Sequence, residues 1–255
     1  MWAKTTAFAL ILAAAAAAQD DDAKKKDDEA KAKIAEFKKE LKGAKDVKDI
    51  TRALEGLGEL QHPKVLGELK NYLARSPDEC ATSAEMIGKY KKDKEAAETL
   101  MSAAGARRDK DSVVKCLRYA GDIEYKAIVG KLTGYFRNKE TDIAKEAVDS
   151  CGKLKSKDAV EPLLNLWREL ENIKEEKAGK DGGLGGGLGG GLGGGGITGT
   201  GGVGASMQEE QLKRKQSLTP AVESAIHKIS GEEFKDLRAA TDWWRRAKST
   251  FKDPE

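Results

Sequence analysis

Apolar residues recur at helical spacing through the middle of the chain, in four stretches that each carry a glycine near the end of a first predicted helix. A small residue stands five positions before each glycine, and a large apolar or aromatic residue stands two positions after it. The glycines are Gly58, Gly88, Gly121 and Gly152, at spacings of 30, 33 and 31 residues. Strand-like alternation is absent, so each stretch predicts a pair of helices.

Local signals for helix ends agree with this register. The run Ser76-Pro77-Asp78-Glu79 has the spacing of a capping box with proline at the first helical position, and Asp158 with Glu161 is a similar pair. We expect each repeat glycine to stand where the backbone becomes left-handed or where the next helix crosses closely.

Helix pairs that repeat every 30–33 residues are typical of an α-solenoid. The runs LGELQHPKVLGEL (residues 57–69) and CGKLKSKDAVEPLL (residues 151–164) carry the pattern best. They resemble the HEAT-repeat family, especially its short bacterial members, whereas a tetratricopeptide array fits less well in period and in its aromatic and proline positions. The resemblance implies an all-α fold with a short solenoid of about four HEAT-like hairpins over residues 47–178.

The first 18 residues have the features of a secretory signal peptide. Lys4 precedes a 12-residue apolar stretch, and small residues end it at Ala18. We expect cleavage near Ala18 and a periplasmic or secreted mature chain. Because no apolar run reaches the length of a membrane span, we expect no stable membrane insertion after cleavage.

Residues 19–46 are dense in Asp, Glu and Lys. Within them, Ile34, Phe37 and Leu41 fall on one helical face, which predicts a helix that caps the open end of the array.

Two different segments follow the array. Residues 179–206 are glycine-rich, with sixteen of the chain's 28 glycines between Gly182 and Gly204, and predict a flexible, disordered linker. Residues 207–255 return to helical spacing and predict a small hairpin whose first helix starts at Thr219-Pro220. The stretch 229–244 resembles a tail found on some exported bacterial HEAT-repeat proteins. We expect the tail to pack on itself or on the array, with docking to another chain as the alternative.

Charge argues against nucleic acid as a partner. The 46 Lys and Arg residues almost balance the 43 Asp and Glu residues, for a net charge of +3. The two signs are interspersed, whereas nucleic-acid binders concentrate basic residues on one face.

No pattern of residues predicts a catalytic, cofactor or metal site. Only His62 and His227 are present, and no His-Glu dipeptide of the kind used by HEAT-like metal hydroxylases occurs. Cys80, Cys116 and Cys151 lack CxxC spacing and fall on the predicted buried faces of helices. Whether any two of them form a disulfide stays open.

The remaining expectation is a binding surface on the second helices. A non-enzymatic scaffold for a protein or peptide partner is the leading hypothesis. The alternatives are an accessory or regulatory subunit that docks through the two tryptophans of its tail, and a lyase-like enzyme of HEAT-like type. The candidate partner-binding residues are Asn71, Tyr72, Met101, Tyr135, Arg137, Asn165 and Arg168 on the array, and Trp243 and Trp244 on the tail.

Overall fold

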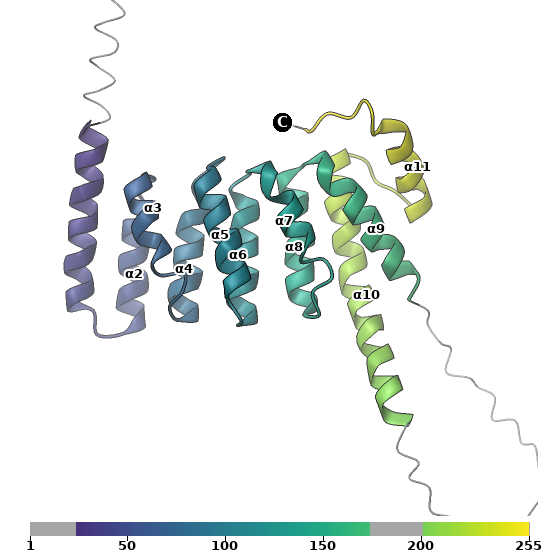
Figure 1. The fold of residues 1–255 in the computed structure, drawn as a ribbon, viewed down its shortest axis with the longest axis horizontal. Helices are drawn as coiled ribbons and strands as arrows, with labels where there is room; N and C mark the ends of the chain where they lie inside the picture. The colour runs from purple at the N-terminus through teal and green to yellow at the C-terminus, as the bar shows by residue number, and fades with distance from the viewer. Residues whose placement is uncertain (1–23, 174–200, 255) are drawn as a thin grey trace, which may run out of the picture. The chain divides into compact units, whose positions relative to one another are not determined.

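The computed structural model describes residues 24–173 and 201–254, and every secondary-structure element in these ranges is a helix (Figure 1). The all-α class is therefore confirmed. The chain divides into two compact units between Lys131 and Leu132. We call them unit 1 and unit 2 and describe each by itself. The predicted signal peptide and most of the predicted linker lie outside the described residues.

Unit 1 consists of a helix over residues 24–43 followed by five more. These are α2 (Val47–Leu57), α3 (Pro63–Lys70), α4 (Pro77–Gly88), α5 (Lys94–Ala106) and α6 (Lys110–Asp122). Aspartate side chains cap three of them, because the first amides of a helix have no partner within it. The capping box of Ser76 and Glu79 at the start of α4 is confirmed.

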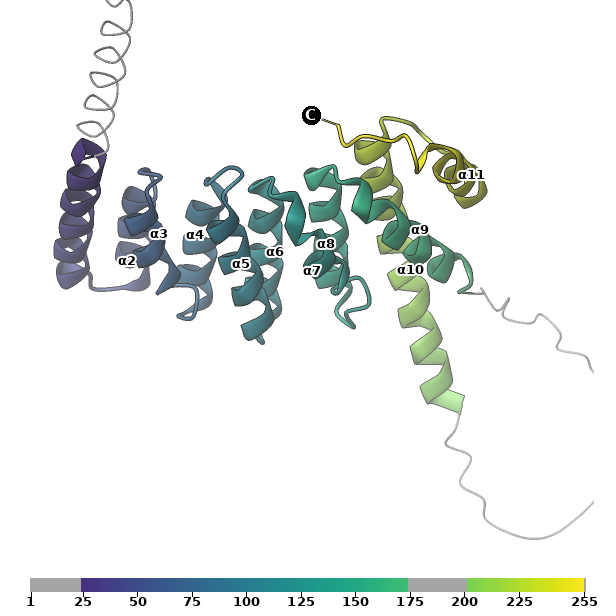
Figure 2. The ribbon, with the colours of Figure 1, turned by 45° about the horizontal axis from the view of Figure 1, so that its top comes forward.

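The first helices of successive hairpins pack against one another. Helix α4 lies against both α2 and α6, as Figures 1 and 2 show, while α3 packs on α4 and α5 on α6. A Cβ added at Gly58 would lie 2.5 Å from Cβ of Met86 on α4, and one at Gly88 would lie 2.9 Å from Cβ of Tyr119 on α6. Gly58 has φ of −73°, so it serves the close crossing of helices and not a left-handed turn.

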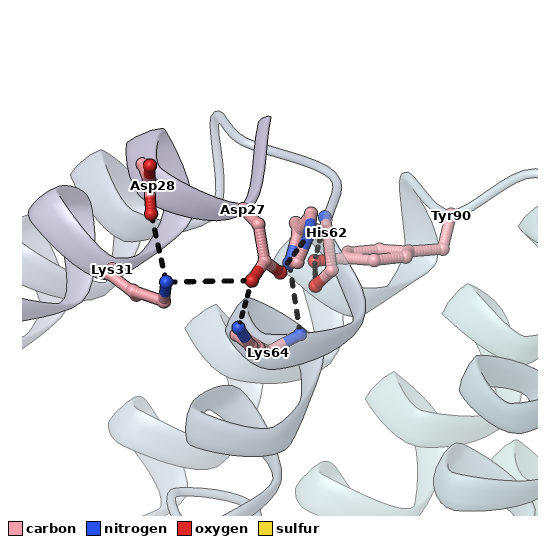
Figure 3. A network of polar contacts seen from close by, with 6 residues as sticks. All are labelled: Asp27, Asp28, Lys31, His62, Lys64 and Tyr90. Atoms are coloured by element: carbon pink, nitrogen blue, oxygen red, sulfur yellow. Dashed lines mark hydrogen bonds and ion pairs between the residues drawn. The ribbon is translucent and has the colours of Figure 1, made fainter. Parts of the chain in front are cut away.

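The helix over residues 24–43 packs against the first hairpin through Phe37, which is 2% exposed. Its ring meets Tyr72 edge-on with centroids 5.6 Å apart. Asp27 on the same helix contacts His62 and Lys64 at the start of α3 (Figure 3). This helix is therefore held to the first hairpin by an aromatic contact with Tyr72, just after α3, and by the ion pair of Asp27 with Lys64 at the start of α3.

Unit 2 holds α8 (Thr141–Leu154), the 3-10 turn η2 (Lys157–Ala159), α9 (Val160–Glu171), α10 (Gly201–Ser230) and α11 (Leu237–Ala247). A 3-10 turn η1 (Lys126–Ile128) ends unit 1, and the short α7 (Val129–Thr133) crosses the boundary between the units. The predicted capping pair of Asp158 and Glu161 is wrong: Ser156 caps η2 through the Asp158 amide at 3.3 Å, and α9 continues from that turn without a side-chain cap.

The sequence prediction was also wrong about the start of the first tail helix. Helix α10 is continuous from Gly201 to Ser230, with Pro220 inside it, so residues 201–206 of the predicted linker are helical. Proline removes one hydrogen bond to the carbonyl four residues earlier. Pro220 and Gln216 both lie on the exposed side, where water can replace that bond. Burial of the opposite side keeps the helix intact.

The buried side of α10 packs against α8 and α9, and α11 packs against α9. Figure 2 shows α8 and α10 side by side. A Cβ at Gly152 on α8 would lie 3.0 Å from Cα of Ala225. The buried apolar residues of α10 are Leu218, Ala221, Val222, Ala225, Ile226 and Ile229.

Candidate functional site

The structure divides the nine candidate partner-binding residues by exposure. Four side chains reach solvent, one is half-buried and four are buried. The exposed ones are Asn71, Arg137, Asn165 and Arg168, the half-buried one is Tyr135, and the buried ones are Tyr72, Met101, Trp243 and Trp244. Asn71, Tyr72 and Met101 belong to unit 1, and the other six belong to unit 2.

The buried candidates of unit 1 serve packing. Tyr72 lies between Phe37 and the guanidinium of Arg75, whose Cζ is 4.1 Å from the ring centroid. Met101 is one of the core residues of α5. Neither side chain is exposed enough to contact a partner.

Trp243 and Trp244 form an aromatic cluster within the tail. The Trp243 ring lies 5.2 Å from Phe234, 5.6 Å from Trp244 and 5.5 Å from Phe251, measured between centroids. Edge-to-face and offset contacts at these distances are favourable. The two tryptophans are only 8% and 7% exposed, so a contact through them would require the cluster to open.

Of the exposed candidates of unit 2, Asn165 and Arg168 stand on α9, and Arg137 is tied to α9 through Glu169. Arg137 forms a forked ion pair with Glu169, with Nε of Arg137 3.2 Å from Oε2 and Nη2 bonded to Oε1. This pairing raises the pKa of Arg137 and lowers the pKa of Glu169. The pair is exposed, so it orients the Arg137 side chain but contributes little to the stability of the fold.

A hollow lies on each side of this ion pair. One, of about 300 Å³, is lined by the segment from Thr133 to Arg137 and by Pro162, Asn165 and Leu166 of α9. The other, of about 360 Å³, lies between α9, residues 137–141 and Arg214 of α10. Both are lined by Arg137, Leu166 and Glu169, so we treat them as one groove, the α9 groove. Each part has room for one or two side chains.

Helix α10 holds one wall of the α9 groove in place. The Arg214 guanidinium donates to the carbonyl oxygens of Phe136 at 2.8 Å and Asn138 at 2.7 Å. Partial burial lowers the pKa of Arg214. Lys215 donates to the carbonyl of Ile173, just beyond the end of α9, at 3.1 Å. The wall residues are thus fixed by side chains from a helix far along the chain.

The outer side of α9 presents unpaired donors beside the groove. Arg168 donates to Oδ1 of Asn165 at 2.9 Å. That bond leaves the Asn165 amide nitrogen and the remaining guanidinium donors of Arg168 without a partner among the described residues. These donors can bind carbonyl or carboxylate oxygens of a ligand.

A third hollow, of about 380 Å³, lies where the tail meets α9. It is lined by Trp167, Phe234 and the outer side of α10, with the carboxylates of Glu223 and Glu233 at its edge. Gly231, with φ of +76°, turns the chain after α10, and Ser230 bonds to Glu232 on both its amide and its carbonyl. This turn fixes the position of Phe234.

His62 lies in a polar network that occupies its ring (Figure 3). Its Nδ1 accepts the Lys64 amide at 3.2 Å and so caps α3, while Nε2 lies 3.5 Å from Asp27. The Lys64 ammonium, 2.5 Å from Asp27, lowers the pKa of that carboxyl. Tyr90 accepts the His62 amide at 3.2 Å. With Nδ1 used as an acceptor, His62 is a structural cap and not an available base.

The remaining reactive groups are buried or dispersed. Cys80, Cys116 and Cys151 are free thiols with no exposed surface. Burial raises the pKa of Cys151 to about 12. Within residues 24–173 and 201–254, no three His, Cys, Asp or Glu side chains are grouped as a metal site, and no helix is long and apolar enough to span a bilayer.

Sequence reasoning missed the residues that complete the α9 groove. Glu169 stands one turn after Asn165 on the same exposed side of α9, so helical spacing could have found it. Arg214 meets Phe136 and Asn138 across 78 and 76 residues, and no local signal marks that contact.

No protein-family model and no curated protein matches this chain. The resemblance to HEAT repeats therefore rests on the spacing of residues in the sequence and stays a prediction.

Proposed function

We propose that this chain is a non-enzymatic, exported scaffold of about four HEAT-like hairpins that binds a protein or peptide segment in the α9 groove. The ordered contacts of α2, α4 and α6 in unit 1, and of α8 and α10 in unit 2, support a stacked-hairpin architecture within each unit. The signal-like residues 1–18 support export, which N-terminal sequencing of the native protein tests; an intact Met1 would contradict it.

One observation carries the binding proposal: unpaired donors stand beside a hollow with an apolar floor. Asn165 lines the hollow together with Phe136 and Leu166, and the Arg168 guanidinium is bonded to Asn165 beside it. Small apolar hollows with a few convergent polar groups are where proteins bind ligands. A peptide matches both parts, because its carbonyls accept hydrogen bonds while an apolar side chain fills the hollow.

The position of the reactive groups also favours binding over catalysis. The buried cysteines do not reach a substrate, and the His62 ring is held as a helix cap. A nucleophile needs an accessible side chain next to a base.

The test is selection of peptides from a random library on the immobilised full chain, followed by fluorescence anisotropy. We expect Arg168→Glu or Asn165→Ala to weaken a selected peptide by about fivefold or more, the effect of losing a contact worth about 1 kcal/mol. Asn71→Ala is the matched control, since Asn71 is exposed at the same distance from its repeat glycine as Asn165.

We expect Asn71→Ala to keep the affinity. Equal loss in Asn71→Ala and Asn165→Ala, or no loss in either α9 variant, would contradict binding in the α9 groove.

A second function, an accessory or regulatory subunit that docks through its tail, is favoured by the hollow between Trp167 and Phe234. The carboxylates of Glu223 and Glu233 have no ion-pair partner among the described residues, so a partner would present a basic side chain there. Glu223→Lys separates the two functions: it abolishes partner binding if the tail docks, and leaves it unchanged if the α9 groove binds.

A further inference from the structure

Two of the three cysteines meet inside unit 1. Cys80 lies on α4 and Cys116 on α6, two helices that pack directly together. Their Sγ atoms are 4.0 Å apart, and neither residue has exposed surface. Cys151 belongs to α8 in unit 2.

The separation of the two sulfurs is compatible with a covalent bond after a small movement. A disulfide has an S–S length of about 2.05 Å, so the two sulfurs must approach each other by about 2 Å. Rotation of the two side chains can supply most of this distance, because the sulfurs already face each other across the helix contact. The order of the helices does not change.

In the packed structure, polar groups around Cys80 favour its thiolate form. The Arg107 guanidinium donates to the Ser112 hydroxyl at 2.9 Å, at the start of α6. The hydrogen bond with the Cys116 thiol has the largest effect on Cys80, and with smaller contributions from Ser112 and Arg107 it outweighs burial and lowers the pKa of Cys80 to about 7. The same hydrogen bond and burial raise the pKa of Cys116. The thiolate is the reactive form of cysteine.

We propose that Cys80 and Cys116 form a disulfide that ties α4 to α6 when the chain meets a small-molecule disulfide such as glutathione disulfide. The Cys80 thiolate attacks one glutathione sulfur and releases the first glutathione thiolate. Cys116 then loses its proton and attacks the Cys80 sulfur, which releases the second glutathione thiolate. Two cysteine thiols are oxidised to one disulfide, one glutathione disulfide is reduced to two thiols, and the two cysteine protons pass to the two glutathione thiolates.

The bond leaves Cys151 as a single thiol, so the odd number of cysteines is accounted for by one pair and one buried side chain. Because both sulfurs are buried, exchange is fastest while the chain folds and slow once α4 and α6 are packed. The proposal is independent of the α9 groove.

The test is refolding of the full chain from denaturant in buffers of varied glutathione to glutathione disulfide ratio. The mixture is then quenched with acid, and the free thiols are labelled with N-ethylmaleimide in denaturant. In oxidising buffer we expect one label per chain, at Cys151, and a linked pair of peptides containing Cys80 and Cys116 that separates on reduction. Three labels at every ratio, or a bond that includes Cys151, would overturn the proposal.

Variants sharpen the result. Cys151→Ser should keep the linked peptides and lose the last label, whereas Cys116→Ser should leave Cys80 free or joined to glutathione. If Cys116→Ser does not fold, labelling of the unaltered chain still shows whether Cys80 and Cys116 form a disulfide. We expect the oxidised Cys151→Ser protein to melt at a higher temperature than the reduced one. Equal melting temperatures would overturn the claim that the bond ties α4 to α6.

Discussion

Helix α10 lies on α8 in unit 2 much as α4 lies on α2 in unit 1. Gly58 meets Met86 and Gly152 meets Ala225, so the two contacted residues can be aligned with each other. If His227 is aligned with the repeat glycine Gly88, Ile226 coincides with Ile87 and Ile229 with Tyr90, and all four are buried. Helix α10 therefore has the same register of buried residues as α4.

The two contacts differ in how far along the chain the second helix lies from the first. Helix α4 comes directly after the hairpin of α2 and α3, whereas α10 begins at Gly201, well after α9 ends at Glu171. His227, which replaces the glycine, is exposed. The pattern of buried residues, and not direct succession along the chain, decides which helix packs against α8.

The largest expected effect compares Ile226→Ala with Ile87→Ala. Both isoleucines are fully buried at the same register position, and truncation of such a side chain costs about 3 kcal/mol through lost burial and an unfilled cavity. Urea unfolding of the two variants measures both costs. A cost below about 1 kcal/mol for Ile226→Ala alone would mean that α10 is only loosely attached to unit 2.

Gly58→Ala is expected to destabilise the protein by about 2 kcal/mol, because its new Cβ would lie 2.5 Å from Cβ of Met86 and force the helices apart. Gly56→Ala, two positions earlier in α2, is the matched control. No atom lies within 4 Å of its new Cβ, so it should stabilise the helix by up to about 1 kcal/mol. The same urea titration distinguishes them, and a stabilising Gly58→Ala would refute the close crossing of α2 and α4.

Gly152→Ala should destabilise the protein by about 1 kcal/mol. Its new Cβ would lie 3.0 Å from the backbone of Ala225, a milder overlap than at Gly58, and the gain in helix propensity offsets part of the cost. Chemical unfolding again gives the value. If Gly152→Ala stabilised the chain as Gly56→Ala does, α10 would not lie against α8 at this position.

Arg137→Gln is expected to change the unfolding free energy least of the four, because its ion pair with Glu169 is exposed and screened by solvent. A large loss of stability would show that the pair is part of the packing of unit 2 and not only a feature of the α9 groove. Thermal unfolding at low and high salt provides the measurement.

The sequence predicted those features that depend on neighbours along the chain. The cap at Ser76, the close crossing at Gly58 and the burial of all three cysteines follow from helical spacing and local preference. The prediction that a helix starts at Thr219-Pro220 was wrong, although proline is often found at helix starts. Burial of one side of α10 outweighs the single hydrogen bond that Pro220 removes on the other side, so the helix continues through it.

The α9 groove could be predicted only in part. Asn165 and Arg168 were predicted as outward-facing residues of a second helix and lie exposed on α9, whereas Arg137, predicted likewise, lies in the turn after α7. Tyr72 was expected to be available to a partner, but the helix over residues 24–43 covers it through Phe37. The position of Arg214 against Phe136 depends on the packing of α10, which spacing along the chain does not reveal.

The packing of α10 on α8 supports one wall of the α9 groove, so the most direct measurement is amide hydrogen exchange of the native full chain. Amides of residues 221–229 in α10 should exchange about as slowly as those of residues 80–87 in α4, since both segments are buried against a neighbouring first helix. Exchange of residues 221–229 at rates near those of an unprotected chain, with residues 80–87 still protected, would contradict the packing of α10 and remove the support for the groove.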